Sequence, residues 1–90
     1  MNLEELRKEI RKVDVKILSL LAERNELSKA IGAFKKEKDM KIKDEKYEDK
    51  LIDELISIGK GKNVSPELIE NIFREIISNS RKIQEENISK

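Results

Sequence analysis

One segment of this sequence is too long to fit inside a compact domain of the chain's own size. From Leu3 to about Lys38 the only helix breaker is Gly32, which costs about 1 kcal/mol in a helix interior. A helix over this segment rises about 1.5 Å per residue and is therefore about 50 Å long. A compact chain of 90 residues has a radius of gyration of only about 12 Å. We therefore expect this helix to extend beyond any core that the rest of the chain can form.

Apolar residues repeat along this segment with a spacing that alternates between three and four, the pattern of a coiled-coil or bundle helix. We call these nine residues the apolar stripe: Leu3, Leu6, Ile10, Val13, Ile17, Leu20, Leu27, Ile31 and Phe34. About half of the stripe would be exposed to water in a single chain, so we expect an intertwined homodimer with the long helices side by side. Coiled-coil pairing with a different protein is the alternative, which the partial core supplied by the rest of the chain makes less favourable.

Two shorter helices are predicted after the long one. The segment 39–43 reads as a loop, and Asp44 can cap the start of the second helix, which Gly59 or Gly61 then ends. Ser65 caps the third helix, which begins at Pro66, where the missing N–H of proline is harmless.

The third helix can run close to Ile88, and no strand-like alternation of apolar and polar residues interrupts the pattern. The predicted fold is therefore all-α, with three helices (one very long) that form an intertwined homodimeric helical bundle. Residues 1–90 are predicted to make a single domain.

Composition excludes several classes of function. The chain has no Cys and no His, so it lacks disulfides, thiol nucleophiles, histidine bases and zinc sites built on these residues. Lys+Arg number 20 against 19 Asp+Glu, and there is no Trp, one Tyr and two Phe, which argues against nucleic acid as a partner. The charged amino terminus and the short apolar runs predict no signal peptide and no membrane span, hence a cytoplasmic protein.

Six polar side chains stand on or beside the apolar faces of the predicted helices: Arg7, Arg24, Lys35, Glu48, Ser80 and Gln84. Each one alone has an ordinary explanation. Arg24 can pair with Glu48 as a buried salt bridge, Lys35 lies in a charged run, and the last two can mark a solvated helix end. Taken together, they predict a polar cavity inside the bundle for a small anion with two carboxylates, because the arginine fork binds carboxylates bidentately.

The ordered set of these residues resembles the all-helical chorismate mutases over nearly the whole chain. The matching segments are Leu6-Arg7, Ile10, Val13-Asp14, residues 20–27, Lys35 eleven residues after Arg24, Asp44 with Glu48, and Ser80 with Gln84. The sequence departs from the pattern at Tyr47, where many members carry Arg.

This resemblance implies conversion of chorismate to prephenate, in the biosynthesis of Phe and Tyr, by a Claisen rearrangement that needs no cofactor and no metal. Arg24 and Ser80 would bind substrate carboxylates, together with Arg7 from the other protomer. Lys35 and Gln84 would contact the ether oxygen. Glu48 would accept a hydrogen bond from the ring hydroxyl, assisted by the backbone near Asp44. The catalytic set so implied is Lys35, Gln84, Glu48 and Arg24.

Two other functions are compatible with the same residues. One is an isochorismate pyruvate lyase, which uses a similar cationic pocket, breaks the same kind of ether bond and needs no cofactor. The other is a non-catalytic helical module for dimerisation or regulation, which would tolerate the loss of Arg24 and Lys35 together.

Overall fold

A computed structural model describes residues 1–89 of the chain, with side chains for residues 1–86. It contains three helices and, within the described part, no strand: α1 (Leu3–Glu37), α2 (Glu45–Lys60) and α3 (Pro66–Ser89). The predicted all-α class and the predicted order of the three helices are confirmed. Assembly into a homodimer stays a prediction, because the structure holds one chain.

The ends of the helices follow from local hydrogen bonds. The Asp44 carboxylate accepts the backbone N–H of Tyr47 at 3.1 Å, and the Ser65 hydroxyl accepts the N–H of Leu68 at 3.3 Å, so both predicted caps are confirmed. Gly61 follows the last residue of α2. Asn2 caps α1 by accepting the N–H of Glu5 at 2.8 Å, a cap that our sequence analysis did not include.

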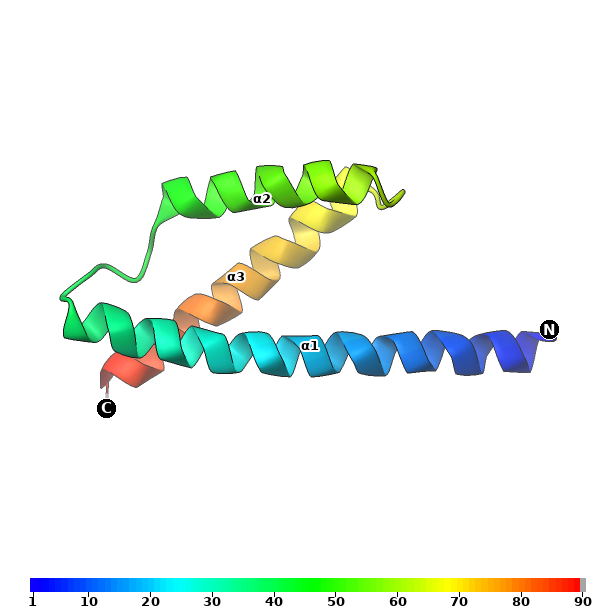
Figure 1. Ribbon diagram of the computed structural model, residues 1–90, viewed down its shortest axis with the longest axis horizontal. Helices are drawn as coiled ribbons and strands as arrows, with labels where there is room; N and C mark the ends of the chain where they lie inside the picture. The colour runs from blue at the N-terminus through cyan, green and yellow to red at the C-terminus, as the bar shows by residue number, and fades with distance from the viewer. Residues whose placement is uncertain (90) are drawn as a thin grey trace.

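The third helix holds the molecule together. It packs against α1 on one side and α2 on the other, whereas the first two helices do not pack on each other over the described residues (Figure 1). The buried apolar core is small and consists of Ile52 from α2 with Ile69 and Ile77 from α3. Gly59 lies so close to Ile69 that a Cβ atom at this glycine would overlap the Ile69 side chain. The core therefore joins α2 to α3.

The first helix extends far beyond this core, as the sequence predicted (Figure 1). The molecule measures 55 × 27 × 15 Å and has a radius of gyration of 16.2 Å, well above the roughly 12 Å of a compact chain of this length. Every side chain from residue 1 to residue 20 is exposed. No helix within residues 1–89 is both long and apolar enough to cross a membrane.

The apolar stripe is more exposed than the sequence led us to expect. We expected about half of it to be covered within the chain, but all nine members are exposed, from 46% at Ile31 to 62% at Ile10 and Leu20. The reason is that α1 packs on α3 through the adjacent face, where Ser28 and Gly32 are buried. Small residues allow the two helix backbones to approach closely, so the large apolar residues beside them remain in water.

Candidate active site

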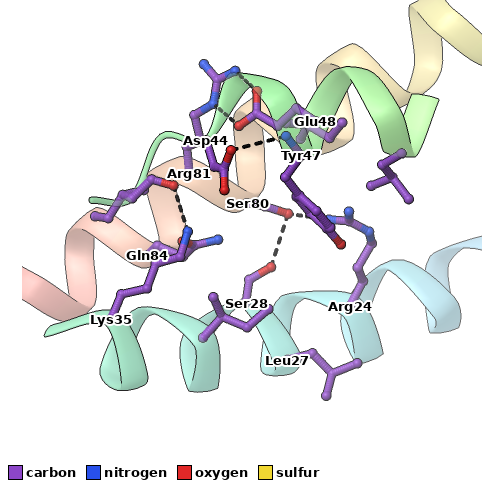
Figure 2. Close-up of a pocket in the computed structure, with 14 residues that line it drawn as sticks. Arg24, Leu27, Ser28, Lys35, Asp44, Tyr47, Glu48, Ser80, Arg81 and Gln84 are labelled. Atoms are coloured by element: carbon purple, nitrogen blue, oxygen red, sulfur yellow. Dashed lines mark hydrogen bonds and ion pairs between the residues drawn. The ribbon is translucent and has the colours of Figure 1, made fainter. Parts of the chain in front are cut away.

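A pocket of about 420 Å³ is lined by residues from all three helices and from the connection between α1 and α2 (Figure 2). Six of the seven site residues predicted from the sequence line it: Arg24, Lys35, Asp44, Glu48, Ser80 and Gln84. They come from α1, from α3 and from α2 with its amino cap. The sequence therefore identified six of the residues that the fold gathers around one cavity.

The wall formed by α1 and α3 contains a connected polar cluster. Arg24 Nη1 donates a hydrogen bond to Ser80 Oγ, and Ser28 Oγ donates to the same Ser80 oxygen at 3.1 Å. Ser80 is only 8% exposed and Ser28 only 3%. The cluster holds the Arg24 guanidinium at the pocket, and it excludes the reading of Ser80 as part of a solvated helix end.

Gln84 lies against α1 because of a glycine. A Cβ atom added to Gly32 would come within 2.8 Å of the Gln84 Cα atom and 3.0 Å of its carbonyl oxygen. The Gln84 side chain is 8% exposed, and its Oε1 atom is buried without a hydrogen-bond partner. A buried amide oxygen without a partner is costly. The Gln84 side chain thus lines the pocket, and its Oε1 atom accepts no hydrogen bond from the rest of the described chain.

Lys35 lies one turn after Gly32 on α1 and is partly buried rather than part of a fully solvated run. Its Nζ atom donates to the carbonyl oxygen of Ile42 at 2.7 Å, which ties the end of α1 to the connection that leads into α2. An ammonium group has three N–H donors, so this contact leaves donors that can reach a ligand in the pocket. Both Lys35 and Ile42 line the cavity.

The opposite wall carries a bidentate ion pair between α2 and α3. Arg81 Nε donates to Glu48 Oε2 at 2.9 Å, and Arg81 Nη2 donates to Glu48 Oε1 (Figure 2). These hydrogen bonds hold the pKa of the Glu48 carboxyl below its ordinary value, and burial of the carboxyl opposes them. The same contact raises the pKa of Arg81.

This ion pair overturns one alternative from the sequence and adds a residue that the sequence analysis missed. The suggested pair of Arg24 with Glu48 is wrong, because Glu48 pairs with Arg81 and Arg24 bonds to Ser80. Arg81 follows Ser80 directly and precedes Gln84 by three residues. Positions three apart share a helix face, and that spacing was the signal that could have identified Arg81.

The charges at the pocket favour an anion. Three cations, Arg24, Lys35 and Arg81, face two carboxylates, Asp44 and Glu48. The described residues contain no group of three or more acidic side chains that could hold a metal ion. The cavity can therefore bind a small anion with hydrogen-bond donors on several sides.

Comparison with known proteins identifies the family. Residues 6–85 match the chorismate mutase type II family. This chain belongs to that family. Over 84 residues, 93% of the chain, it is 33% identical to a protein named chorismate mutase from Methanocaldococcus jannaschii, and the match covers 85% of that relative.

Other relatives are longer proteins. The chain is 38% identical over 84 residues to a bifunctional chorismate mutase/prephenate dehydratase from Buchnera aphidicola and 36% identical over 75 residues to one from Escherichia coli. These matches cover 93% and 83% of the chain but only 22% and 19% of the respective relatives. The chain thus spans about a fifth of the length of these bifunctional relatives.

One predicted residue of the chorismate mutase site lies outside the pocket. Arg7 is on the exposed amino-terminal part of α1 and is not among the residues that line the cavity of its own chain. Tyr47, the departure from the family pattern, does line the cavity, with 61% of its surface exposed. The single chain therefore brings together every predicted site residue except Arg7, which the resemblance assigns to the other protomer.

Proposed function

We propose that this chain converts chorismate to prephenate. The observation that carries the proposal is the pocket in which Arg24, Lys35 and Gln84 are brought together from two helices, in a chain that belongs to the chorismate mutase type II family over residues 6–85. The names of the relatives favour the mutase over the lyase and over the non-catalytic module.

In this proposal the α1–α3 wall binds a substrate carboxylate. Arg24 presents a guanidinium that Ser28 and Ser80 hold through the polar cluster. A guanidinium fixed in this way binds a carboxylate without first losing much side-chain freedom. Arg7 of a second copy binds the other carboxylate. Anchoring both ends of a flexible substrate favours the compact shape in which its two reacting carbons meet.

Lys35 and Gln84 act on the ether oxygen of the substrate. The rearrangement breaks a C–O bond while a C–C bond forms, and it involves no nucleophile and no proton transfer, so negative charge grows on this oxygen in the transition state. An ammonium and an amide N–H placed at the oxygen bind the transition state more tightly than the ground state. Gln84 lines the pocket, and its amide nitrogen points into it (Figure 2), which supports this role.

Glu48 accepts the ring hydroxyl of the substrate at the opposite wall. Each carboxylate oxygen has two acceptor sites, so the bonds from Arg81 leave Glu48 able to accept another donor. Asp44, whose side chain caps α2, keeps the adjacent backbone in place beside the hydroxyl.

A homodimer completes the site in this proposal. The exposed apolar stripe and the exposed position of Arg7 support it, because a second copy of α1 would cover the stripe and bring its arginine toward the pocket. Two equivalent sites then follow from twofold symmetry. Light scattering of the purified protein tests the assembly: we expect twice the 10.5 kDa chain mass, and a monomer at the concentration used for activity assays would refute it.

The remaining predictions rest on sequence and family. We propose that the reaction serves the biosynthesis of Phe and Tyr, that residues 1–90 form one domain, and that the protein acts in the cytoplasm.

A direct assay tests the proposed function. Purified protein is mixed with chorismate, the loss of the diene absorbance is followed, and the product is identified by chromatography. We expect stoichiometric prephenate and no pyruvate. Pyruvate released from isochorismate, supplied in a parallel assay, would instead support the lyase, and no turnover of either substrate at high protein concentration would refute the enzymatic proposal. Because the chain has one Tyr and no Trp, its own absorbance interferes little.

A further inference from the structure

The Glu48–Arg81 ion pair joins α2 to α3 at the wall of the pocket. Glu48 is buried to 6% exposure, whereas the Arg81 side chain is 32% exposed at the pocket. The residue that precedes Glu48 is the uncharged Tyr47, and the cation beside the carboxylate comes from α3 instead. A buried carboxylate needs a partner to stay ionised, and here that partner also lines the cavity.

We propose that Arg81 is a positioning residue of the site, which holds Glu48 ionised and in a single orientation for the ring hydroxyl of the substrate. This inference rests on the proposed function. Arg81 acts through Glu48 and is assigned no contact with the reacting atoms.

The geometry of the pair favours positioning over simple adhesion between helices. Arg81 uses Nε and Nη2, one edge of its planar fork, against both oxygens of Glu48. Two parallel hydrogen bonds fix the plane of the carboxylate as well as its place. A single bond from a flexible ammonium would leave the carboxylate free to rotate. The acceptor sites that remain on Glu48 are therefore held in a constant direction.

The surrounding charges have smaller effects on this pair. Lys43 and the backbone at Asp44 also lower the pKa of Glu48, and Glu45 and Glu85 raise the pKa of Arg81. Across the cavity, the cations of Arg24 and Lys35 face the same space. The bonds from Arg81 are the largest single influence on the Glu48 pKa, so removal of Arg81 leaves a buried carboxyl that ionises less readily.

The chain offers a matched control for the same two helices. Arg74 of α3 pairs with Asp49 of α2 at 3.1 Å, as Arg81 pairs with Glu48, but both members of this second pair are exposed and neither lines the pocket. If Arg81 only attached α3 to α2, loss of Arg74 would have a similar effect. If Arg81 positions Glu48, loss of Arg81 changes turnover and its pH dependence, whereas loss of Arg74 changes neither.

The experiment compares the wild type with Arg81→Met, Arg81→Lys and Arg74→Met in the chorismate assay across pH. We expect Arg81→Met to lower kcat/KM by about ten- to a hundredfold, by analogy with the loss of a group that orients a metal ligand. We also expect the acid limb of its pH–rate profile to move to higher pH, because the Glu48 carboxyl loses the charged partner that lowers its pKa. Arg81→Lys keeps the positive charge but loses the planar guanidinium fork. It is therefore expected to lower kcat/KM less than Arg81→Met does and to shift the acid limb of the pH–rate profile less. Arg74→Met leaves both unchanged.

A readout without substrate separates this inference from the proposed function. Labelled Glu48 is titrated by carbon NMR, with Glu48→Gln used to assign its carboxyl signal, and Arg81→Met is expected to raise the measured pKa. An inactive wild type refutes the proposed function, whatever the titration gives. An active wild type, with Arg81→Met matching Arg74→Met in rate, pH profile and Glu48 titration, overturns the role of Arg81.

Discussion

The two halves of α1 have the same secondary structure but opposite relations to the rest of the chain. Residues 1–20 are all exposed, although six of the nine members of the apolar stripe lie among them. The second half supplies Arg24 and Lys35 to the pocket and buries Ser28 and Gly32 against α3. One half of this helix therefore builds a site in its own chain, and the other half is left exposed, where our proposal places a second copy.

The largest expected effect comes from placing charge on the first half of α1. In Leu6→Glu with Ile10→Glu, no residue of the pocket is altered, yet we expect the dimer and nearly all turnover to be lost. Each apolar side chain contributes about 1.5–3 kcal/mol when buried, and the two positions occur in both protomers, so roughly 6–12 kcal/mol of association is lost. Light scattering and the chorismate assay measure the two effects.

Lys12→Ala with Lys16→Ala serves as the control, because these residues lie on the charged side of the same half. It is expected to remain dimeric and active. A dimer of unchanged stability in the Leu6 and Ile10 variant would show that the stripe does not form the interface.

The next largest effect on turnover is expected from substitutions in the second half of α1 and in α3, which packs against it. Lys35→Ala and Gln84→Ala should each lower kcat by about 100- to 1000-fold, as the loss of one donor to a developing oxyanion does. The dimer should remain folded by circular dichroism. Lys36→Ala is the matched control, since Lys36 is exposed on the adjacent face and should retain full turnover. Near-normal kcat in either pocket variant would contradict the assignment.

A smaller effect should follow from closing the space between α1 and α3. Gly32→Ala adds a methyl group 2.8 Å from the Gln84 backbone, and overpacking of this kind costs about 1–3 kcal/mol. The gain in helix propensity offsets about 1 kcal/mol of that. We expect a lower free energy of unfolding and a kcat about tenfold lower, since a shifted donor misses the ether oxygen.

Gly61→Ala is the comparison variant for Gly32→Ala. The nearest atom to a Cβ at Gly61 is the Ile58 carbonyl oxygen at 3.4 Å, and the residue has the right-handed helical conformation. It should change neither activity nor stability by a measurable amount. Equal behaviour of the two alanine variants would refute the close approach at Gly32.

The smallest expected effect concerns stability in acid. The folded-state pKa of Glu48 is lowered, chiefly by Arg81, so its contribution to stability is present above the unfolded value of about 4.3 and is lost as pH falls through the lower folded value. Glu48→Gln should therefore be less stable than the wild type at pH 7, by about 1 kcal/mol given the partial exposure of Arg81. Thermal unfolding should show this difference shrinking below about pH 4.3. A constant difference from pH 7 to pH 3 would contradict the ionised pair.

Much of the fold could be predicted because local signals mark it. Pro66 and the side-chain caps Asp44 and Ser65 act within a few residues of the helix ends, so they marked those ends without knowledge of packing. The length of α1 also predicted that part of it would be exposed to water, because a helix longer than the core of a small domain cannot be covered along its whole length. The face that α1 presents to α3 was mispredicted, because close packing selected the small residues Ser28 and Gly32 over the larger apolar ones.

The sequence predicted most of the polar residues of the site, but it did not predict which of them pair with one another. Arg24, Glu48 and Ser80 were identified because polar residues on inward faces are costly and therefore informative. Which of them pair depends on where α2 and α3 cross, and sequence spacing within one helix does not specify that crossing. For this reason the sequence offered Arg24 as one alternative partner of Glu48, whereas the fold supplies Arg81.

The most direct test of a site shared between two chains is to mix two inactive variants. Arg7→Ala and Arg24→Ala are each expected to be inactive, and they are refolded together in equal amounts. Random pairing makes about half of the dimers mixed, and each mixed dimer contains one intact site, so about one quarter of wild-type activity should return. Recovery near that value supports the account that one half of α1 completes the partner's pocket. No recovery, in a mixture shown by mass spectrometry to contain the mixed dimer, would contradict it.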